Sequence, residues 1–425
     1  MKLHKYVFTF FKNGHSRTIK AKKNIIASFG LKGVSILVSF LLVPLTLTYL
    51  NPTKYGLWLT LSSIIGWFGF FDIGLGNGLR NKLGEAFSVG DNRLAKIYIS
   101  TTYAILFIII GVVYLLILFI NPLLDWSTIL NAPPEMASEL SSVVLIIFTF
   151  FSIRFVLNLI GIILTADQLP AYNNIFGTVG NVIALAAIYI VTKISQGSLL
   201  YISIIFSAVP VFVLLGGSIF FFKKKYKEIK PSLAFVDFKY FNSLTGLGFK
   251  FFILQIAAII IFSTDNFIIT KFLGPKEVTP YNIAFKYFGI PIMIFSIIMT
   301  PYWSAFTNAN ALEDISWIKN SLKKLVRIWL LLIVVTIIML IFSNSFYLFW
   351  IGDAVYIPFQ LSALMAIYAI LMSWNSIFTN YINGVGKLKL QIYEAIFAMI
   401  INIPISIFFA VNLGMGSRGI ITGTI

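Results

Sequence analysis

The sequence predicts an all-α, polytopic membrane protein, and three observations lead to this fold class. Of the 425 residues, 59% are hydrophobic and only 11% are charged, which excludes a soluble domain whose surface faces water. The apolar residues form runs of the roughly 20 residues that cross a bilayer core as a helix. The net charge of +17 collects in the segments between alternate runs, as in proteins that thread a membrane repeatedly.

Eleven apolar runs are long enough to span a membrane as helices. In chain order they cover residues 24–49, 57–79, 97–120, 142–165, 173–192, 199–222, 246–270, 281–304, 327–348, 360–382 and 391–411. A twelfth run begins near Gly419 and reaches the end of the sequence at Ile425. We therefore expect the twelfth span to be incomplete.

The basic residues indicate on which side of the membrane each connecting segment lies. With the N-terminus inside, most of the 32 Lys and Arg residues fall in five inner segments, 1–23, 80–96, 223–239, 319–327 and 387–389. The outer loops hold only Lys54, Lys193, Lys271, Lys276 and Arg418. This asymmetry predicts a cytoplasmic N-terminus. The charge thus reports topology, and we expect no nucleic-acid partner.

The N-terminal segment 1–23 precedes a run too long for the apolar core of a cleavable signal peptide, so the first helix should remain as an anchor. Its mixture of bases and aromatics fits a disordered positive anchor or a segment lying on anionic membrane lipids. The sequence contains no cysteine, which excludes disulfides and thiolate metal sites.

Two short matches predict that a unit of six spans occurs twice. YLNPTKYGLW (49–58) resembles FLGPKEVTPYN (272–282) at an offset of 223, and AFSVGDNRLAKIY (86–98) resembles AFTNANALEDISWIKN (305–320) at an offset near 219. Because six is even, both lobes would face the same way around a central cavity. We expect a basic N-terminal segment (1–23), a six-helix lobe (24–222), a cytoplasmic linker (223–245) and a C-terminal lobe with about five complete spans (246–425).

Charged side chains inside the predicted spans are costly, at roughly 2.5–3.5 kcal/mol each near a helix centre, and so are candidates for function. Arg154 lies deep in its span, and we expect it to face a watery cavity or a buried acid. Lys32 corresponds to Gln255 through the offset of 223, which suggests that both polar residues line a cavity. The alternative for Lys32, and the favoured interpretation of Lys250, is snorkelling to the inner surface.

Asp72 follows an apolar run in FDIGLGNGLR (71–80), close to the cytoplasmic end of its span. Gly74 and Gly78 have the GxxxG spacing that lets a neighbouring helix approach closely. We expect Asp72 to pair with a base such as Lys32, and a role in a gate is the alternative.

Asp265 and Lys286 lie at similar depth on consecutive predicted helices. One interpretation is a structural ion pair between them. The other is that Asp265, with Asn266 and Thr264 beside it, offers oxygen ligands to a sodium ion or a titratable site to a proton.

Several enzymatic motifs are absent. NGVGKLKL (383–390) lacks both the first glycine and the Ser or Thr of a nucleotide-binding P-loop. The chain has no HExxH motif, and both histidines lie in the N-terminal segment. We therefore expect no enzyme, no metal site and no cofactor beyond a coupling proton or sodium ion.

The chain resembles the polysaccharide repeat-unit flippases, the O-antigen and capsule exporters of the multidrug/oligosaccharidyl-lipid/polysaccharide exporter superfamily. The resemblance is carried by NIIASFGLKGVSILVSFLLVPLTLTYLNPTKYGLW, FDIGLGNGLRNKLGEAFSVGD and FSTDNFIITKFLGP, and extends over nearly the whole chain. It implies two six-helix bundles in the bacterial inner membrane that move an undecaprenyl-diphosphate-linked oligosaccharide from the inner to the outer leaflet by alternating access. Polymerase and other glycan-assembly membrane proteins are the partners that it implies.

A diphosphate headgroup needs positive charge to replace its lost hydration, and Lys32, Arg154 and Lys250 would supply it in a central cavity. Asp265 is the candidate acid for coupling to an ion. Two other functions stay open: a drug/cation antiporter of the same superfamily, which would need an acidic cavity, and a non-transporting scaffold of a glycan-assembly complex.

Overall fold

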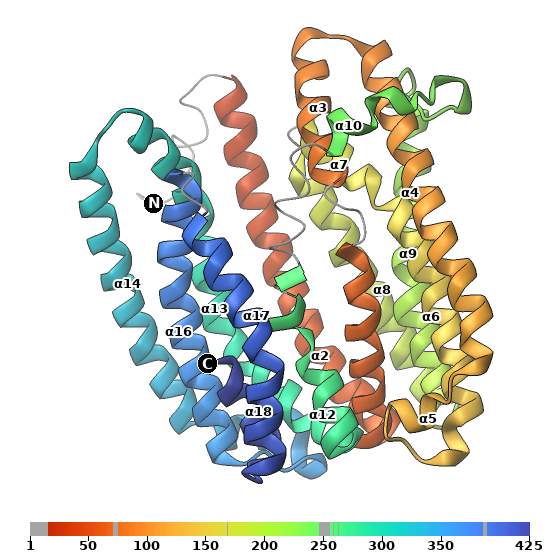
Figure 1. Cartoon of the computed structure of the whole chain (residues 1–425), viewed down its shortest axis with the longest axis vertical. Helices are drawn as coiled ribbons and strands as arrows, with labels where there is room; N and C mark the ends of the chain where they lie inside the picture. Colours follow the sequence, from red (N-terminus) through yellow and green to blue (C-terminus); the bar gives the residue numbers. More distant parts are fainter. Residues whose placement is uncertain are drawn as a thin grey trace, which may run out of the picture. The chain divides into compact units, whose positions relative to one another are not determined.

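The protein is all-helical in the computed structural model (Figure 1), as the sequence predicts. The structure describes residues 16–70, 75–167, 169–245, 256–257, 259–261, 263–385 and 389–425. Within these ranges, nine helices are long and apolar enough to cross a membrane. The chain is therefore a multi-pass membrane protein.

The first half of the chain begins with a long helix, α2 (Ser16–Trp67), which covers the first predicted span and enters the second. The helices that follow are α3 (Leu75–Val89), α4 (Asn92–Ile120), α5 (Trp126–Ile129), α6 (Ala137–Leu157), α7 (Leu159–Ala166), α8 (Pro170–Ile194), α9 (Leu199–Lys223) and α10 (Phe241–Thr245). The second half contains α12 (Asp265–Leu273), α13 (Pro275–Ala311), α14 (Ile315–Ile341), α15 (Ser343–Ile351), α16 (Phe359–Val385), α17 (Lys389–Ile407) and α18 (Ser417–Thr424).

The chain forms two compact units. Unit 1 contains Met1–Tyr49, Phe68–Trp126 and Glu135–Phe252, and unit 2 contains Leu50–Trp67, Ser127–Pro134 and Ile253–Ile425. The predicted lobe boundaries after residues 23, 222 and 245 stay a prediction.

Each unit has its own apolar core, built where long helices present aliphatic and aromatic side chains to one another. In unit 1, residues such as Leu79, Ile99 and Ile160 bring together α3, α4 and α7 and are fully buried. In unit 2, Phe295 and Leu325 lie in a core formed by α13, α14 and α16. Burial of these side chains, at about 25 cal/mol per Å² of apolar area, favours each packed unit.

The repeat seen in the sequence has a counterpart in the backbone. Asn51 interrupts α2 with φ 69° and ψ 163°. Gly274, which is 223 residues later, separates α12 from α13 with φ 95° and ψ 155°. A proline follows each break, Pro52 and Pro275, and fixes φ for the first turn of the next helix.

The two proline segments also pack together within unit 2, in a reciprocal manner. Thr279 Oγ1 donates a hydrogen bond of 2.7 Å to the carbonyl oxygen of Pro52. A Cβ atom added to Gly56 would lie 1.8 Å from the carbonyl oxygen of Pro275. Gly56 and Thr279 are themselves 223 residues apart, so each segment contacts the other through equivalent positions.

A second pair of turns corrects the other repeat offset. Gly90 (φ 73°) and Glu313 (φ 54°) precede Asp91 and Asp314. The Asp91 carboxylate caps α4 by accepting from Leu94 N at 2.8 Å, and the Asp314 carboxylate caps α14 by accepting from Trp317 N at 2.9 Å. These turns are 223 residues apart, so the sequence match at an offset near 219 is wrong by one helical turn.

The segment that follows α9 is docked onto unit 1 rather than extended away from it. Ser232 N donates to Ser100 Oγ at 3.0 Å, and Asp237 N donates to Thr101 Oγ1 at 3.0 Å, so both bonds attach the segment to α4. Further along, a Cβ atom added to Gly78 of α3 would lie 1.7 Å from the carbonyl oxygen of Leu244 in α10. Gly78 thus permits the close approach that its spacing predicts.

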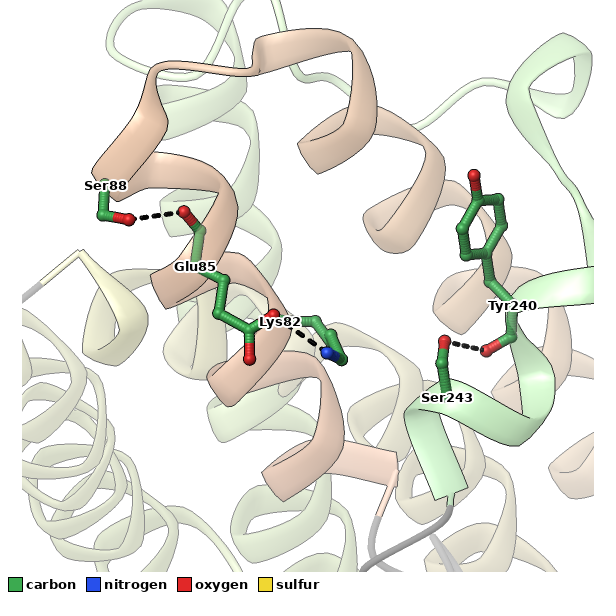
Figure 2. A network of polar contacts seen from close by, with 5 residues as sticks. All are labelled: Lys82, Glu85, Ser88, Tyr240 and Ser243. Atoms are coloured by element: carbon green, nitrogen blue, oxygen red, sulfur yellow. Dashed lines mark hydrogen bonds and ion pairs between the residues drawn. The ribbon is translucent and has the colours of Figure 1, made fainter.

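Figure 2 shows polar contacts on both sides of this approach. On α3, Lys82 Nζ lies 2.8 Å from Glu85 Oε2, and Ser88 Oγ donates to the carbonyl oxygen of Glu85 at 2.7 Å. On the docked segment, Ser243 Oγ donates to the carbonyl oxygen of Tyr240 at 2.8 Å. These contacts are local to each segment, so the glycine, and not an ion pair, holds α3 and α10 together.

Candidate functional site

Asp265 is a buried carboxylic acid at the first position of α12, with 7% of its surface exposed. The hydroxyl group of Tyr281, on α13, donates a hydrogen bond to Asp265 Oδ2. Among the residues that the structure describes, the other oxygen, Oδ1, has no hydrogen-bond partner. A buried acceptor without a donor is costly, so this oxygen is poised to receive a proton or a cation.

Two asparagines extend the polar cluster along the same helical hairpin. Asn282 Nδ2 donates to Asn266 Oδ1 at 2.6 Å. Asn266 Nδ2 in turn donates to Ser63 Oγ at 2.8 Å, which brings in the second part of α2. The side-chain oxygen of Asn266, the residue after the acid, is therefore held in place from two helices.

Threonines and a tryptophan tie the same part of α2 to α12. The hydroxyl groups of Thr60 and Thr270 lie 2.5 Å apart and are fully buried. Trp67 Nε1 donates to the carbonyl oxygen of Ser263 at 3.2 Å, beside the acid. Polar groups buried in an apolar environment are retained when they are satisfied in this way, and such a network fixes the geometry around Asp265.

Lys286 lies on α13, one turn beyond Asn282, and is half-buried. Asp265 makes its side-chain contact with Tyr281 and not with Lys286. Tyr281 also stacks on Phe285, at a ring distance of 6.5 Å and an interplanar angle of 9°. The hairpin therefore surrounds the acid with a phenol and aromatic rings rather than with an ammonium group.

Lys32 and Arg154 are both exposed in unit 1. Lys32 is on α2, which α8 holds through Thr178 Oγ1, a donor to the carbonyl oxygen of Leu31 at 3.3 Å. Arg154 is in the last turn of α6, just before the interruption at Asn158. Neither base has an ion pair with any acid in the part of the chain that the structure describes.

Three predicted site residues, Asp72, Lys250 and Gln255, lie outside the described residues. The structure thus brings together Asp265 and Asn266, and it places Lys32 and Arg154 on separate helices of unit 1. The predicted substrate-binding and coupling roles of all these residues stay predictions.

Tyr281, Asn282, Ser63 and Thr60 belong to the polar cluster, but the sequence did not single them out. They are uncharged residues of common types, so each alone gives little signal in an apolar run. One signal was available: Tyr281 and Asn282 each follow Asp265 and Asn266 by 16 residues, on the two sides of the Gly274–Pro275 turn. A tight turn between two helices makes such residues neighbours.

Chemically, the cluster offers a carboxylate, two amides and several hydroxyl groups within one region of unit 2. Hard cations take oxygen ligands of these kinds, and a buried carboxyl group can also carry a proton.

Comparisons with known proteins agree with this fold. A family described as polysaccharide biosynthesis protein matches residues 21–306. A protein of Yersinia pseudotuberculosis named for O-antigen export is 23% identical over 409 residues, which cover 92% of this chain and 89% of that protein. A protein of Salmonella typhi named for O-antigen transport is 21% identical over 363 residues and covers 83% of this chain and 81% of its own length.

Solved structures show the same helical architecture. An inward-facing multidrug resistance MATE family transporter of the MOP superfamily aligns with a TM-score of 0.74 at 15% identity, covering 94% of this chain and 93% of that one. A eukaryotic MATE transporter aligns with a TM-score of 0.63 at 15% identity, covering 96% and 92%. Because the family match covers more than half of the sequence, the chain belongs to the polysaccharide biosynthesis protein family and has the fold of the MOP superfamily.

Proposed function

We propose that this protein is a flippase that moves undecaprenyl-diphosphate-linked oligosaccharide repeat units from the inner to the outer leaflet of the bacterial inner membrane. The product would be used for O-antigen, capsule or exopolysaccharide synthesis. In this proposal the N-terminus is cytoplasmic, as the distribution of bases favours. The family and the fold are those of a transporter and not of an enzyme.

One observation carries the proposal: the likeness to a relative named for O-antigen export extends over 92% of this chain and 89% of the relative. The match therefore covers whole proteins and not a shared domain. A flippase for a glycan carried on a polyprenyl lipid is the transport activity that such an export route requires.

The intramembrane bases support the choice of an anionic substrate. Arg154 is exposed on a spanning helix and has no acidic partner among the described residues. An uncompensated base costs roughly 2.5–3.5 kcal/mol at a helix centre, and a diphosphate headgroup would offset this cost when it binds. Lys32 supplies a second positive charge on α2 of the same unit.

The buried acid supports coupling to an ion. We propose that Asp265, with the side-chain oxygen of Asn266 nearby, takes up a proton or a sodium ion during the transport cycle. Tyr281 would keep one carboxylate oxygen in place while the other is occupied. The phenol is a neutral donor, so it leaves the acid free to bind a cation.

The test of the function is depletion of the protein in its host, followed by analysis of lipid-linked glycans on each leaflet. We expect the undecaprenyl-diphosphate-linked repeat unit to accumulate on the inner leaflet while surface glycan disappears. Normal surface glycan after depletion would contradict the proposal. Loss of the linked glycan itself, without accumulation, would indicate a role in assembly and not in transport.

A further inference from the structure

We propose that the segment after α9 forms a binding site for the headgroup of an anionic phospholipid. A pocket of about 520 Å³ lies at the end of α9 within unit 1. Its lining includes Asn92 at the start of α4, Asp167 after α7, and Lys224, Lys225 and Lys227. The proposal concerns a resident lipid, so it goes beyond the transported substrate.

The backbone that carries these lysines is held firmly on unit 1. Tyr226 and Ile229 are each only 4% exposed and anchor the segment on its inward side. Tyr226 N donates to the carbonyl oxygen of Phe221 at 2.8 Å, and its hydroxyl group donates to Asp167 Oδ2 at 2.8 Å. Lys224 and Lys227 thus project from a fixed frame, unlike the bases of a free polybasic loop.

Both acids of the pocket are already engaged. Asp167 forms an ion pair with Lys225 in addition to its bond with Tyr226. The Glu228 carboxylate accepts from Asn92 Nδ2 at 2.6 Å. Lys224 and Lys227 have no ion pair with an acid in the described part of the chain, so the pocket keeps an excess of positive charge.

An apolar surface leads directly to this pocket. Phe212, Leu215, Ile219 and Phe220 are exposed on one face of α9, at the spacing expected for a single helical face. Lys223 continues the same face, and Lys224 Nζ lies 4.7 Å from the centre of the Phe220 ring. A spanning helix with such a face exposes it to acyl chains, and the bases stand where the headgroups begin.

The continuity of the two surfaces favours a phospholipid as the occupant. A soluble phosphate compound would use the basic pocket and leave the apolar face of α9 without a role. A phospholipid would use both, with its acyl chains along Phe212 and Ile219 and its phosphate beside Lys224 and Lys227. The positive-inside rule places this end of α9 at the inner leaflet, where anionic lipids are available.

Native mass spectrometry on the purified full-length protein tests the site, with phosphatidylglycerol and phosphatidylcholine added separately. We expect phosphatidylglycerol to be retained in preference. In the double variant Lys224→Gln/Lys227→Gln its affinity should fall roughly 30-fold, because each base near a membrane surface contributes about a fivefold preference for an anionic lipid. The double variant Lys323→Gln/Lys324→Gln, which removes two exposed bases from α14, should bind as the unmodified protein does.

Three outcomes would overturn the proposal. Unchanged binding by the Lys224/Lys227 variant would remove the pocket, and an equal loss in both variants would indicate general surface electrostatics. Displacement of phosphatidylglycerol by inorganic pyrophosphate, or a preference for a polyprenyl diphosphate, would assign the pocket to a soluble anion or to the substrate. Phe220→Ala keeps all the bases, and we expect it to weaken lipid binding without changing pyrophosphate binding.

Discussion

Asp265 shows how a carboxylate is kept in an apolar hairpin. The Tyr281 hydroxyl group satisfies one oxygen, and aromatic rings exclude water from that side. The sequence predicted the acid as a candidate because a charge in an apolar run is costly and therefore conspicuous. Its donor is a tyrosine from the next helix, and only the register of the folded hairpin brings it within reach, so the sequence did not identify it.

The acid and its donor give a matched pair of variants. Asp265→Asn removes the charge but keeps an acceptor for Tyr281, so we expect normal or improved stability and a loss of ion-dependent export. Tyr281→Phe removes the donor and should lower the free energy of unfolding by about 1.5–3 kcal/mol, as for a lost bond to a charged group. Ion dependence of glycan export in vesicles and thermal unfolding in detergent measure the two effects. Unchanged ion dependence in Asp265→Asn would leave the acid a structural role only.

Arg154 belongs to the same scale. We expect Arg154→Ala to abolish surface glycan export while the protein still inserts, because the removed base has no acidic partner among the described residues to leave unpaired. Arg154→Lys keeps the charge and should retain part of the activity. Quantifying surface glycan against the amount of membrane-inserted protein gives the comparison. Full export by Arg154→Ala would exclude the base from substrate binding.

At the scale of the element, the paired turns before α4 and α14 show what a sequence pattern does and does not determine. Hydropathy alone predicted where the spans lie, because the bilayer imposes their length. It missed the continuity of α2 through Asn51, since a single left-handed residue redirects a helix without a break in hydrophobicity. It also misaligned the second repeat, because turns depend on φ and on capping hydrogen bonds rather than on residue identity.

The same turns predict opposite effects of one exchange. Gly90 adopts its positive φ without strain, whereas Glu313 holds an equivalent φ at a cost of about 1–2 kcal/mol. We expect Glu313→Gly to raise the thermal unfolding temperature and Gly90→Glu to lower it. Thermal denaturation of both purified variants measures the shifts. Shifts of the same sign would show that the positive φ does not govern stability at these turns.

At the scale of the whole molecule, the segment between α9 and α10 behaves as a part of unit 1. Its backbone bonds to Ser100 and Thr101 leave little freedom to move independently of α4. We infer that the change of conformation during transport is taken up after α10 and not within this segment. The two cytoplasmic ends of α3 and α4 are then carried along with it.

A crosslink tests this inference, and the absence of native cysteines makes the experiment clean. Cysteines introduced as Ser100→Cys and Ser232→Cys can be joined by a short thiol-reactive reagent. We expect export by the crosslinked protein to equal that of the untreated double variant, because the segment stays docked throughout the cycle. A loss of export on crosslinking that a cleavable reagent reverses would show that the segment must detach.

The reciprocal contact between the two proline turns has an evolutionary consequence. Pro52 accepts from Thr279, and Gly56 makes room for Pro275, with both pairs related by the same shift along the chain. Self-complementary patches of this kind form the interface of a twofold homodimer. A half-length ancestor would have met a second copy of itself through this patch, and gene duplication with fusion would then have allowed one copy to acquire Asp265 while the other kept an apolar residue, Leu42, at the equivalent position.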